Sequence, residues 1–571
     1  MPGFVGSGQG AGSCLLEDPA LTDLVLPAGA TLTPAFSPDT TTYVAMLPRG
    51  TTAPAITPTV AQPSHATITV AGNIVVSGES EAVPLDFVPT IIDVVVTTDS
   101  GATRTYTITT TRGTAGYVKA SNTEASDLFG RSVSISADGT RLAVGATGED
   151  SAATGINGDQ TSNGALNSGA AYVFVRSGET WIQEAYIKAS NTSANAQFGE
   201  SVALSTDGSR LAVGAQNEGG SGAAYVFVRS GSTWAQEAFV KASNAELNDF
   251  FGNAVAISGD GSRLGVGAFF EDSPAVGVNG GQGNGADESG AAYVFTRTGT
   301  TWAQEAFVKA SNTNAADQFG SSLALSGDGL RLAVGAPSED SIATGVNGNQ
   351  ADNTANFAGA VYVFGRTGTA WTQEAYVKAT NTGASDIFGD SVSLSEDGSR
   401  LAVGASGEAS GSANVGGNQA DNGVPGAGAA YVFLRTTTTW APEAYFKASN
   451  PGNSDSFGFS VSLSPDGARL GVGAQNEDSA ATGLDGDQLS QGAGDSGAAY
   501  LYKRTGTTWA NQVYVKAINT GGNDLFGATV VLSADEARFA VGARFESSNA
   551  TGVDGDATSN AASQSGACYI Y

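Results

Sequence analysis

The chain repeats one sequence motif seven times between Phe129 and Ala543. The first copy reads FGRSVSISADGTRLAVGA (residues 129–146) and the last reads FGATVVLSADEARFAVGA (526–543). The Phe-Gly glycines recur at steps of 69, 53, 68, 69, 69 and 69 residues, at Gly130, Gly199, Gly252, Gly320, Gly389, Gly458 and Gly527. Such a period, with many glycines and short apolar runs, is typical of propellers and β-solenoids.

Each repeat divides into four extended segments, which the second copy illustrates. Apolar and polar side chains alternate over residues 198–204, which predicts a first strand. An Asp-Gly hairpin turn follows, and residues 210–215 form the second strand. Residues 222–229 and 234–242 form the third and fourth strands. Four antiparallel strands make one blade of a β-propeller, so the pattern predicts an all-β fold.

The two ends of the repeat region complement each other. The last repeat stops after its third strand (565–571), and the missing fourth strand precedes the first repeat as GYVKASN (116–122). We therefore expect residues 114–571 to form a seven-bladed β-propeller in which an N-terminal strand completes the last blade. An open solenoid would need atypical capping repeats, and none is evident.

The repeat resembles a known family. The Phe-Gly opening followed by Val-Gly-Ala, as in GTRLAVGA (139–146) and GLRLAVGAP (329–337), resembles the FG-GAP repeat of integrin α-subunit propellers and more closely its bacterial integrin-like relatives. The resemblance covers residues 116–571 and implies an extracellular recognition propeller. Calcium-binding integrin blades carry D-x-D-x-D-G between the first two strands, whereas this chain has only S-x-D-G, as at 258–261, so those ligands do not carry over.

A different segment precedes the repeats. Residues 21–113 are rich in Thr, Val and Pro, with period-two alternation in TYTITTT (105–111), and predict a β-sandwich. The stretches 21–48 and 104–112 resemble the cadherin-like β-sandwich of bacterial surface proteins, without the calcium motifs of true cadherins. We expect residues 1–20 to be a flexible Gly/Ser-rich segment, which does not read as a secretory signal.

Charge excludes two classes of partner. The formal net charge of −29 disfavours nucleic acids and anionic membrane surfaces, because both require a surplus of Lys and Arg. No run approaches the ~20 apolar residues needed to cross a bilayer. Most arginines occupy two repeat positions, and seven lysines share one, so we expect these basic residues to be architectural, pairing with the Glu of W-x-x-E or the Asp before Phe-Gly. The seven lysines are Lys119, Lys188, Lys241, Lys309, Lys378, Lys447 and Lys516.

The residues offer little for catalysis. The only histidine, His65, lies in the predicted sandwich, which excludes a Ser-His-Asp triad or a histidine-based zinc site in the propeller. Paired carboxylates could serve a glycosidase, but no distinctive pair stands out. We predict that the chain is not an enzyme.

The long insert between the second and third strands is the predicted site. Its carboxylates and amides, on Gly-bent loops, are ligands that Ca²⁺ prefers, and the alternative is that they cap turns. The candidate calcium ligands, and with them the only predicted cofactor, are Asp485, Asp487, Asp554, Asp556, Asp150, Asn157, Asp159 and Asp340. The second repeat lacks this insert, which predicts either an asymmetric partner-binding rim or a simple deletion.

We expect a non-enzymatic extracellular or cell-surface protein that acts in adhesion or recognition, binding a protein or glycan on a propeller rim. Exposed aromatic residues such as Phe269, Phe270 and Phe357 would mark such a rim. One alternative is a structural subunit that binds copies of itself in a filament or layer. Cys14 and Cys568, at opposite ends, could then form a bridge or stay unpaired. A weaker alternative is a hydrolase that uses acidic loops.

Overall fold

The structure is a computed structural model that describes residues 18–48, 51, 53–85, 90–112, 116–178, 180–534 and 538–571. It divides into two compact units, residues 1–113 and 114–571, which we call the sandwich and the repeat domain. Most of the predicted flexible segment, with Cys14, lies outside the described residues. The described residues form strands and two short 3-10 turns, η1 (Pro63–His65) and η2 (Glu218–Gly220), and contain no helix able to cross a membrane.

The sandwich packs two sheets around one apolar core. A three-stranded sheet has the order β1-β4-β7 and a six-stranded sheet the order β2-β3-β9-β8-β5-β6, in which β3 and β9 run parallel. Inward residues such as Tyr43, Ile92 and Tyr106 are fully buried, and they alternate with outward residues as strand periodicity requires. The strands are β1 (Leu21–Val25), β2 (Thr31–Thr33), β3 (Thr42–Leu47), β4 (Ala55–Val60), β5 (Ala66–Val70), β6 (Asn73–Val75), β7 (Glu81–Ala82), β8 (Ile91–Thr98) and β9 (Thr103–Arg112).

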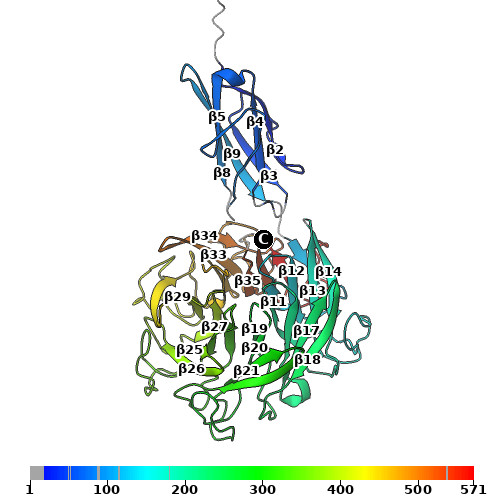
Figure 1. The fold of residues 1–571 in the computed structure, drawn as a ribbon, viewed down its shortest axis with the longest axis vertical. Coiled ribbons are helices and arrows are strands. Elements are labelled where there is room, and N and C mark those ends of the chain that lie inside the picture. The colour runs from blue at the N-terminus through cyan, green and yellow to red at the C-terminus, as the bar shows by residue number, and fades with distance from the viewer. Residues whose placement is uncertain are drawn as a thin grey trace, which may run out of the picture. The chain divides into compact units, whose positions relative to one another are not determined.

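The described part of the repeat domain consists of seven four-stranded antiparallel sheets (Figure 1). The first six each use four consecutive strands, and the seventh has the order β10-β37-β36-β35. The strands are β10 (Gly116–Val118), β11 (Phe129–Ile135), β12 (Arg141–Ala146), β13 (Ala170–Ser177), β14 (Thr180–Ile187), β15 (Phe198–Leu204), β16 (Arg210–Ala215), β17 (Ala223–Ser230), β18 (Thr233–Val240), β19 (Val255–Ile257), β20 (Arg263–Ala268), β21 (Ala291–Thr298), β22 (Thr301–Val308), β23 (Ser322–Leu325), β24 (Arg331–Ala336), β25 (Ala360–Thr367), β26 (Ala370–Val377), β27 (Phe388–Leu394), β28 (Arg400–Ala405), β29 (Ala429–Thr436), β30 (Thr439–Phe446), β31 (Phe457–Leu463), β32 (Arg469–Ala474), β33 (Ala498–Thr505), β34 (Thr508–Val515), β35 (Phe526–Leu532), β36 (Phe539–Ala543) and β37 (Ala567–Ile570).

The first strands of the seven sheets lie at the middle of the domain. Each contacts the first strand of the next sheet, and β35 contacts β11. In Figure 1, β11, β19, β27 and β35 surround the centre, whereas β14, β18 and β26 lie toward the outside. Serine hydroxyls join neighbouring inner strands: Ser132 Oγ donates to the Gly199 carbonyl at 2.8 Å, and Ser134 Oγ accepts from Leu204 N at 2.9 Å. These bonds satisfy backbone groups on edge strands that would otherwise lack partners.

A ring of backbone hydrogen bonds surrounds the centre at the turns between the first and second strands. Six turn residues donate N–H to a carbonyl of the next sheet at 2.8 to 3.0 Å. The seventh, Pro465, has no N–H to donate. The donor–acceptor pairs are Ala534–Ala137, Ala137–Thr206, Thr206–Gly259, Gly259–Gly327, Gly327–Glu396 and Glu396–Pro465.

The Phe-Gly pairs pack as core. Phe198 is fully buried and meets Tyr225 edge-on at a centroid distance of 5.3 Å. Gly199 has φ of +92°, and a Cβ there would lie 2.3 Å from the Ala170 carbonyl oxygen of the preceding sheet. Only glycine allows this backbone approach, so the motif fixes the packing of neighbouring sheets.

The predicted partners of the lysines are wrong. Lys188 Nζ lies 2.6 Å from Glu149 Oε2, and Glu149 belongs to the long insert rather than to W-x-x-E. Both side chains are at most 2% exposed. The acid three residues after Val-Gly-Ala pairs with the lysine in every sheet, as Lys119–Glu546, Lys188–Glu149, Lys241–Glu218, Lys309–Glu271, Lys378–Glu339, Lys447–Glu408 and Lys516–Glu477.

Each buried glutamate also joins two sheets. Asn122, which follows β10 of the seventh sheet, donates to Glu149 Oε1 of the first sheet at 3.0 Å. Tyr186 donates to the same oxygen at 2.6 Å, and Ser151 N donates to Oε2 at 3.2 Å. These bonds compensate the carboxylate for the water it loses on burial.

The W-x-x-E glutamates bind arginine, as predicted. Glu237 accepts from Arg210 of its own sheet at 3.1 Å and from Arg297 of the next sheet at 2.7 Å. Trp302 Nε1 of that next sheet also donates to Glu237, at 3.1 Å. A second set of charged contacts therefore joins neighbouring sheets near the opposite turns.

We predict that Lys119→Met destabilises the repeat domain more than Lys241→Met does. Loss of Lys119 leaves Glu546 buried without its counter-charge, a change that typically costs about 3–5 kcal/mol. Lys241 and Glu218 are 29% and 13% exposed, so water can replace that lysine. Urea unfolding of both variants measures the difference, and an equal loss in the two would contradict the prediction.

We also predict that the repeat domain loses stability as the pH rises from 6 to 8. Burial, opposed by a backbone hydrogen bond, raises the pKa of six aspartates before Phe-Gly from 3.8 to about 7: Asp127, Asp249, Asp317, Asp386, Asp455 and Asp524. A raised folded-state pKa gives stability that is complete below the unfolded-state pKa and is lost as the pH passes through 7. Calorimetry should show a lower Tm at pH 8 than at pH 6. Asp317→Asn should reduce this dependence of Tm on pH.

Candidate functional site

The predicted calcium ligands act as backbone acceptors in three equivalent positions. Asn157 Oδ1 accepts from Tyr186 N at 2.9 Å, and Asp485 and Asp554 make the same bond to the fourth strand of their sheets at 3.0 and 3.2 Å. All three residues have φ between 50° and 54°, a conformation that Asn and Asp tolerate well. They therefore fasten the start of each long loop to the outer strand.

The other predicted ligands cap turns further along the loops. Asp159, Asp487 and Asp556 each accept from the backbone N–H two residues later, at 2.9 to 3.0 Å. Threonine hydroxyls add bonds to Asp159 and Asp556 and lower the pKa of both carboxyls. Asp150 and Asp340 accept from the N–H seventeen residues later, at 2.7 and 2.9 Å.

No group of three or more His, Cys, Asp or Glu residues lies close enough to hold a metal ion within the described ranges. Each predicted ligand has at least one oxygen engaged with the backbone. Calcium binding by these loops stays a prediction.

The face at the Phe-Gly ends of the inner strands carries a position that varies from sheet to sheet. The residue after each Phe-Gly pair has a different identity in each sheet, although its neighbours repeat. We call these seven residues the inner rim: Arg131, Glu200, Asn253, Ser321, Asp390, Phe459 and Ala528. Chemistry at this position therefore changes around the centre while the backbone stays the same.

Charged residues join the first sheet to the second and the seventh sheet to the sixth near the inner rim. Arg131 Nε donates to Glu200 Oε1 at 3.1 Å, and Arg131 Nη2 contacts the same oxygen. Arg544, the first residue after β36, donates from Nη2 to Gln475 Oε1 at 3.2 Å. Arg544 Nε is buried and has no partner among the described residues.

An aromatic group occupies the third sheet beside the inner rim. Phe250 stacks on Phe269 at a centroid distance of 5.5 Å and meets Phe270 edge-on at 5.3 Å. All three side chains are partly exposed. Phe357, the other predicted aromatic, lies in the long loop of the fourth sheet and is 53% exposed. Nearby Asn253 Oδ1 is buried without a partner.

Asp390 places a carboxyl at the inner rim of the fifth sheet. Ser406 Oγ donates to its Oδ2 at 2.6 Å. Burial raises the pKa of Asp390 from 3.8 to about 6, and the serine bond opposes this shift only in part. Burial and the serine bond together set this pKa.

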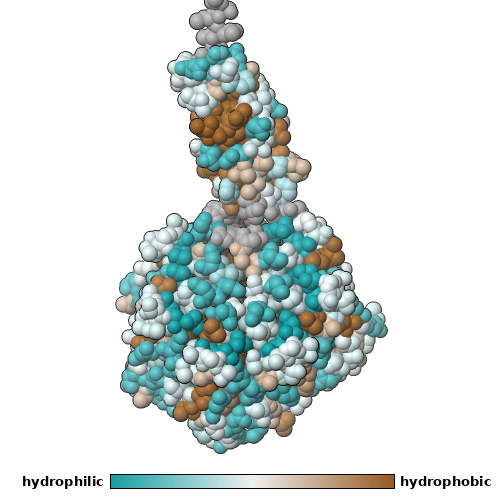
Figure 2. Space-filling model, viewed as in Figure 1, coloured by the Kyte–Doolittle hydropathy of each residue, from teal (hydrophilic) through white to brown (hydrophobic). Residues whose placement is uncertain are grey.

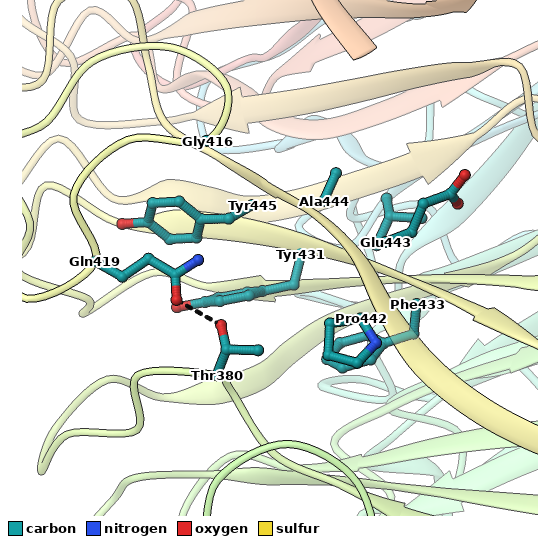
Figure 3. Close-up of a pocket in the computed structure, with 10 residues that line it drawn as sticks. Thr380, Gly416, Gln419, Tyr431, Phe433, Pro442, Glu443, Ala444 and Tyr445 are labelled. Carbon is teal, nitrogen blue, oxygen red and sulfur yellow. Dashed lines mark hydrogen bonds between the residues drawn. The ribbon is translucent and has the colours of Figure 1, made fainter. Parts of the chain in front are cut away.

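A cavity of about 260 Å³ lies beside β30 (Figure 3). It is lined by Tyr431, Phe433, Pro442, Tyr445 and Thr380, among others. Pro442 takes the position of a glutamine in the first four sheets, such as Gln373, so less side chain fills the space. Tyr431, Phe433 and Tyr445 are at most 3% exposed, and Figure 3 shows Thr380 bonded to Gln419 over this space.

His65 and Cys568 belong neither to the inner rim nor to the residues that line the cavity. His65 Nδ1 lies 2.9 Å from Asp99 Oδ2 in the sandwich, and both side chains are more than half exposed. Cys568 is a free thiol buried in β37, and burial raises its pKa. Cys14 lies outside the described residues.

The family comparisons agree with the repeat pattern and the sandwich. The FG-GAP repeat model matches residues 117–174, 181–227, 234–295, 302–364 and 371–433. The cadherin-like beta sandwich domain model matches residues 21–113. The chain belongs to the FG-GAP repeat family and carries an N-terminal cadherin-like β-sandwich.

Solved structures show weaker likeness. The β-propeller domain of Cps50 (Swd1) from Myceliophteria thermophila is 10% identical, with 77% of this chain and 95% of that chain covered and a TM-score of 0.43. The periplasmic gluconolactonase PpgL of Pseudomonas aeruginosa is 14% identical, with 75% and 93% covered and a TM-score of 0.41. No curated protein matches the chain.

The inner rim was not predicted from the sequence, although its signal was present. Aligning the seven copies shows one variable position between the invariant Phe-Gly and the alternating inner strand. The acidic loops were predicted as the site instead, because they are rich in potential calcium ligands. Within a repeat protein, a residue that changes from copy to copy is the better guide to a binding surface.

We predict that Asp390→Asn stabilises the repeat domain at pH 8 and has little effect near pH 4. The ionised carboxylate is the form that burial disfavours, and a rise of about two pKa units corresponds to about 1–2 kcal/mol after allowance for partial solvation. Unfolding curves at the two pH values measure the change. Asparagine keeps an acceptor for Ser406, so an equal effect at both pH values would contradict this origin.

Proposed function

We propose that this chain is a non-enzymatic recognition protein, displayed outside a bacterial cell or on its surface, that binds a protein or glycan. In this proposal the seven sheets are the blades of one closed propeller, and the ligand binds at the inner rim. The contact between β35 and β11, the pairing of β10 with β37 and the backbone ring support closure.

One observation carries the proposal: the copies diverge at the inner rim while the residues that hold the fold recur. A cationic segment (Arg544, Arg131), an aromatic group (Phe250, Phe269, Phe270) and an acid (Asp390) occupy different sheets around one centre. Such unlike groups on a rigid scaffold give one orientation to a bound partner.

The long loops add to the asymmetry of this face. In six sheets a long loop follows the second strand on the Phe-Gly side, whereas the second sheet has only residues 216–222 with the 3-10 turn η2. The short connection of the second sheet interrupts the series of long loops beside the inner rim. A partner can approach the aromatic group of the third sheet from this side.

The geometry at the inner rim favours binding over catalysis. Hydrolysis of a glycoside requires two free carboxyl groups at a fixed separation, and of the two carboxyls of the inner rim, Asp390 and Glu200, the second is bound to Arg131. The histidine needed for a catalytic triad is confined to the sandwich. Recognition therefore accounts for the inner rim with fewer assumptions than a hydrolase does.

Self-assembly is a second candidate function, favoured by the exposed face of the sandwich. Val44, Met46 and Ile91 are 44%, 56% and 65% exposed on the six-stranded sheet. Figure 2 shows hydrophobic areas on the sandwich, whereas the visible propeller surface is mainly hydrophilic with small, separate hydrophobic spots. Exposed apolar side chains gathered on one sheet can mark a contact between subunits.

We predict that a ligand found on arrays of extracellular proteins and glycans binds the full chain in a way that depends on Phe270. Loss of a central aromatic group typically costs 2 kcal/mol or more, so Phe270→Ala should weaken binding by about thirtyfold. Leu330→Ala, at an exposed turn residue on the opposite side, is the matched control and should bind normally.

Light scattering separates the two candidates. Monomers in solution together with Phe270-dependent binding support recognition. Large assemblies that dissociate in a Met46→Glu variant, with no ligand on the arrays, would overturn recognition in favour of self-assembly.

A further inference from the structure

Arg544 is a cation that forms no ion pair with any acid of the described residues, in a strongly acidic chain. Its guanidinium carbon lies 5.3 Å from the ring centroid of Phe545 and 5.9 Å from that of Phe459. Its Nη2 donates a hydrogen bond to the neutral side-chain oxygen of Gln475 at 3.2 Å. Its Nε is buried with no hydrogen-bond partner among the described residues.

Glu200, an acid whose charge acts on Arg544, is already engaged. Glu200 accepts from Arg131, the residue that neighbours Arg544 across the boundary between the seventh and first sheets. Arg131 and Glu200 neutralise each other, which leaves Arg544 as the uncompensated charge. The arginines of the second strands differ, since Arg141 and Arg210 lie 3.2 and 3.1 Å from a glutamate oxygen.

The position of Arg544 is costly for the free protein. A buried donor without a partner costs about 1–3 kcal/mol, and more when the group is charged. Burial and the nearby Arg131 charge lower the pKa of Arg544 from 12.5 to about 10. An unsatisfied charged group at a surface that varies between otherwise equal repeats indicates a site that a ligand completes.

We propose that Arg544 binds the carboxylate of an acidic side chain of a partner protein, between Phe459 and Phe545 at the inner rim. The planar guanidinium matches a planar carboxylate with two parallel hydrogen bonds. The two flanking rings limit access of water and strengthen the charge interaction. This inference rests on the proposed recognition function and specifies the chemistry of the partner.

The charge balance favours a monovalent group over a phosphate monoester. Arg544 supplies one uncompensated positive charge, which a monovalent carboxylate neutralises. A phosphate monoester carries nearly two negative charges at pH 7 and would leave a negative charge in a chain whose formal net charge is −29. A sulfate ester is monovalent like a carboxylate, but it lacks the planar pair of oxygens that matches the guanidinium. A sulfated glycan is therefore the competing occupant that the experiment must separate.

The test is the rate at which phenylglyoxal modifies Arg544 in the full chain, followed by peptide mass spectrometry. The probes are N-acetylglutamic acid α-amide, sodium sulfate and sodium phosphate, each compared with sodium chloride at equal ionic strength. The carboxylate probe should slow modification by about tenfold once its concentration reaches about nine times its Kd. Arg229, whose Nε also lacks a partner but which lies near the opposite turns, is the control and should be unaffected.

Two variants test the geometry without relying on the modification. The carboxylate probe should raise the Tm of the wild type and of Arg229→Gln, but not of Arg544→Gln. Arg544→Lys keeps the charge and loses the planar fork, so its Tm shift should be smaller than that of the wild type. An equal shift in Arg544→Gln would overturn the proposal.

The remaining outcomes are equally decisive. Protection by sulfate or phosphate but not by the carboxylate overturns the proposal in favour of an anionic glycan. Equal protection of Arg229 shows non-specific screening and also overturns it. The probe requires no partner protein, so protection at Arg544 can occur even if the arrays yield no ligand. Conversely, the arrays could yield a ligand whose binding depends on Phe270 while the carboxylate probe fails to protect Arg544 from phenylglyoxal. That result would overturn the Arg544 site and leave the recognition function standing.

Discussion

The repeat domain depends on burying a lysine ammonium against a glutamate in each sheet. In six of the seven pairs the lysine side chain is 0% exposed and the glutamate at most 2% exposed, so neither charge keeps its water. The pair tolerates this only because hydroxyl and backbone donors complete the glutamate's hydrogen bonds. An asparagine from the preceding sheet binds the same glutamate, which makes the burial of one pair depend on the position of the neighbouring sheet.

This dependence explains how the described ends of the domain come together. Lys119 precedes the first repeat, yet its partner Glu546 belongs to the last. The two charges are buried together only where β10 pairs with β37, so the ion pair and this strand pairing depend on each other. The turn side has its own constraint, since Ala534 N donates to the Ala137 carbonyl across the same junction. Charge pairing on one side and backbone bonding on the other therefore hold the first and last repeats together.

Much of the fold could be predicted because repetition multiplies weak local signals. The second repeat alone predicts its first two strands at residues 198–204 and 210–215, as the structure has them, and its third and fourth strands to within two residues. The Arg–Glu contacts were predictable because both residues recur within one sheet. The lysine partners were not, since Glu149 and Lys188 are separated by a loop and a hairpin, and the loop was interpreted as a binding site. The fixed offset of each glutamate from Val-Gly-Ala was the missed indication of a structural role.

Repetition also determines where function can be sought. A residue present in all seven copies serves the scaffold, because seven equal sites around an axis would give a partner no preferred orientation. Specific recognition requires that the symmetry be broken, and the inner rim breaks it at a position where the inner strands of all seven sheets meet. Arg544, Asp390 and the three phenylalanines differ in charge and shape, and each lies on a backbone held rigidly by the recurring contacts. The buried pairs thus permit variation at the inner rim, because side chains there can change without altering the packing between sheets.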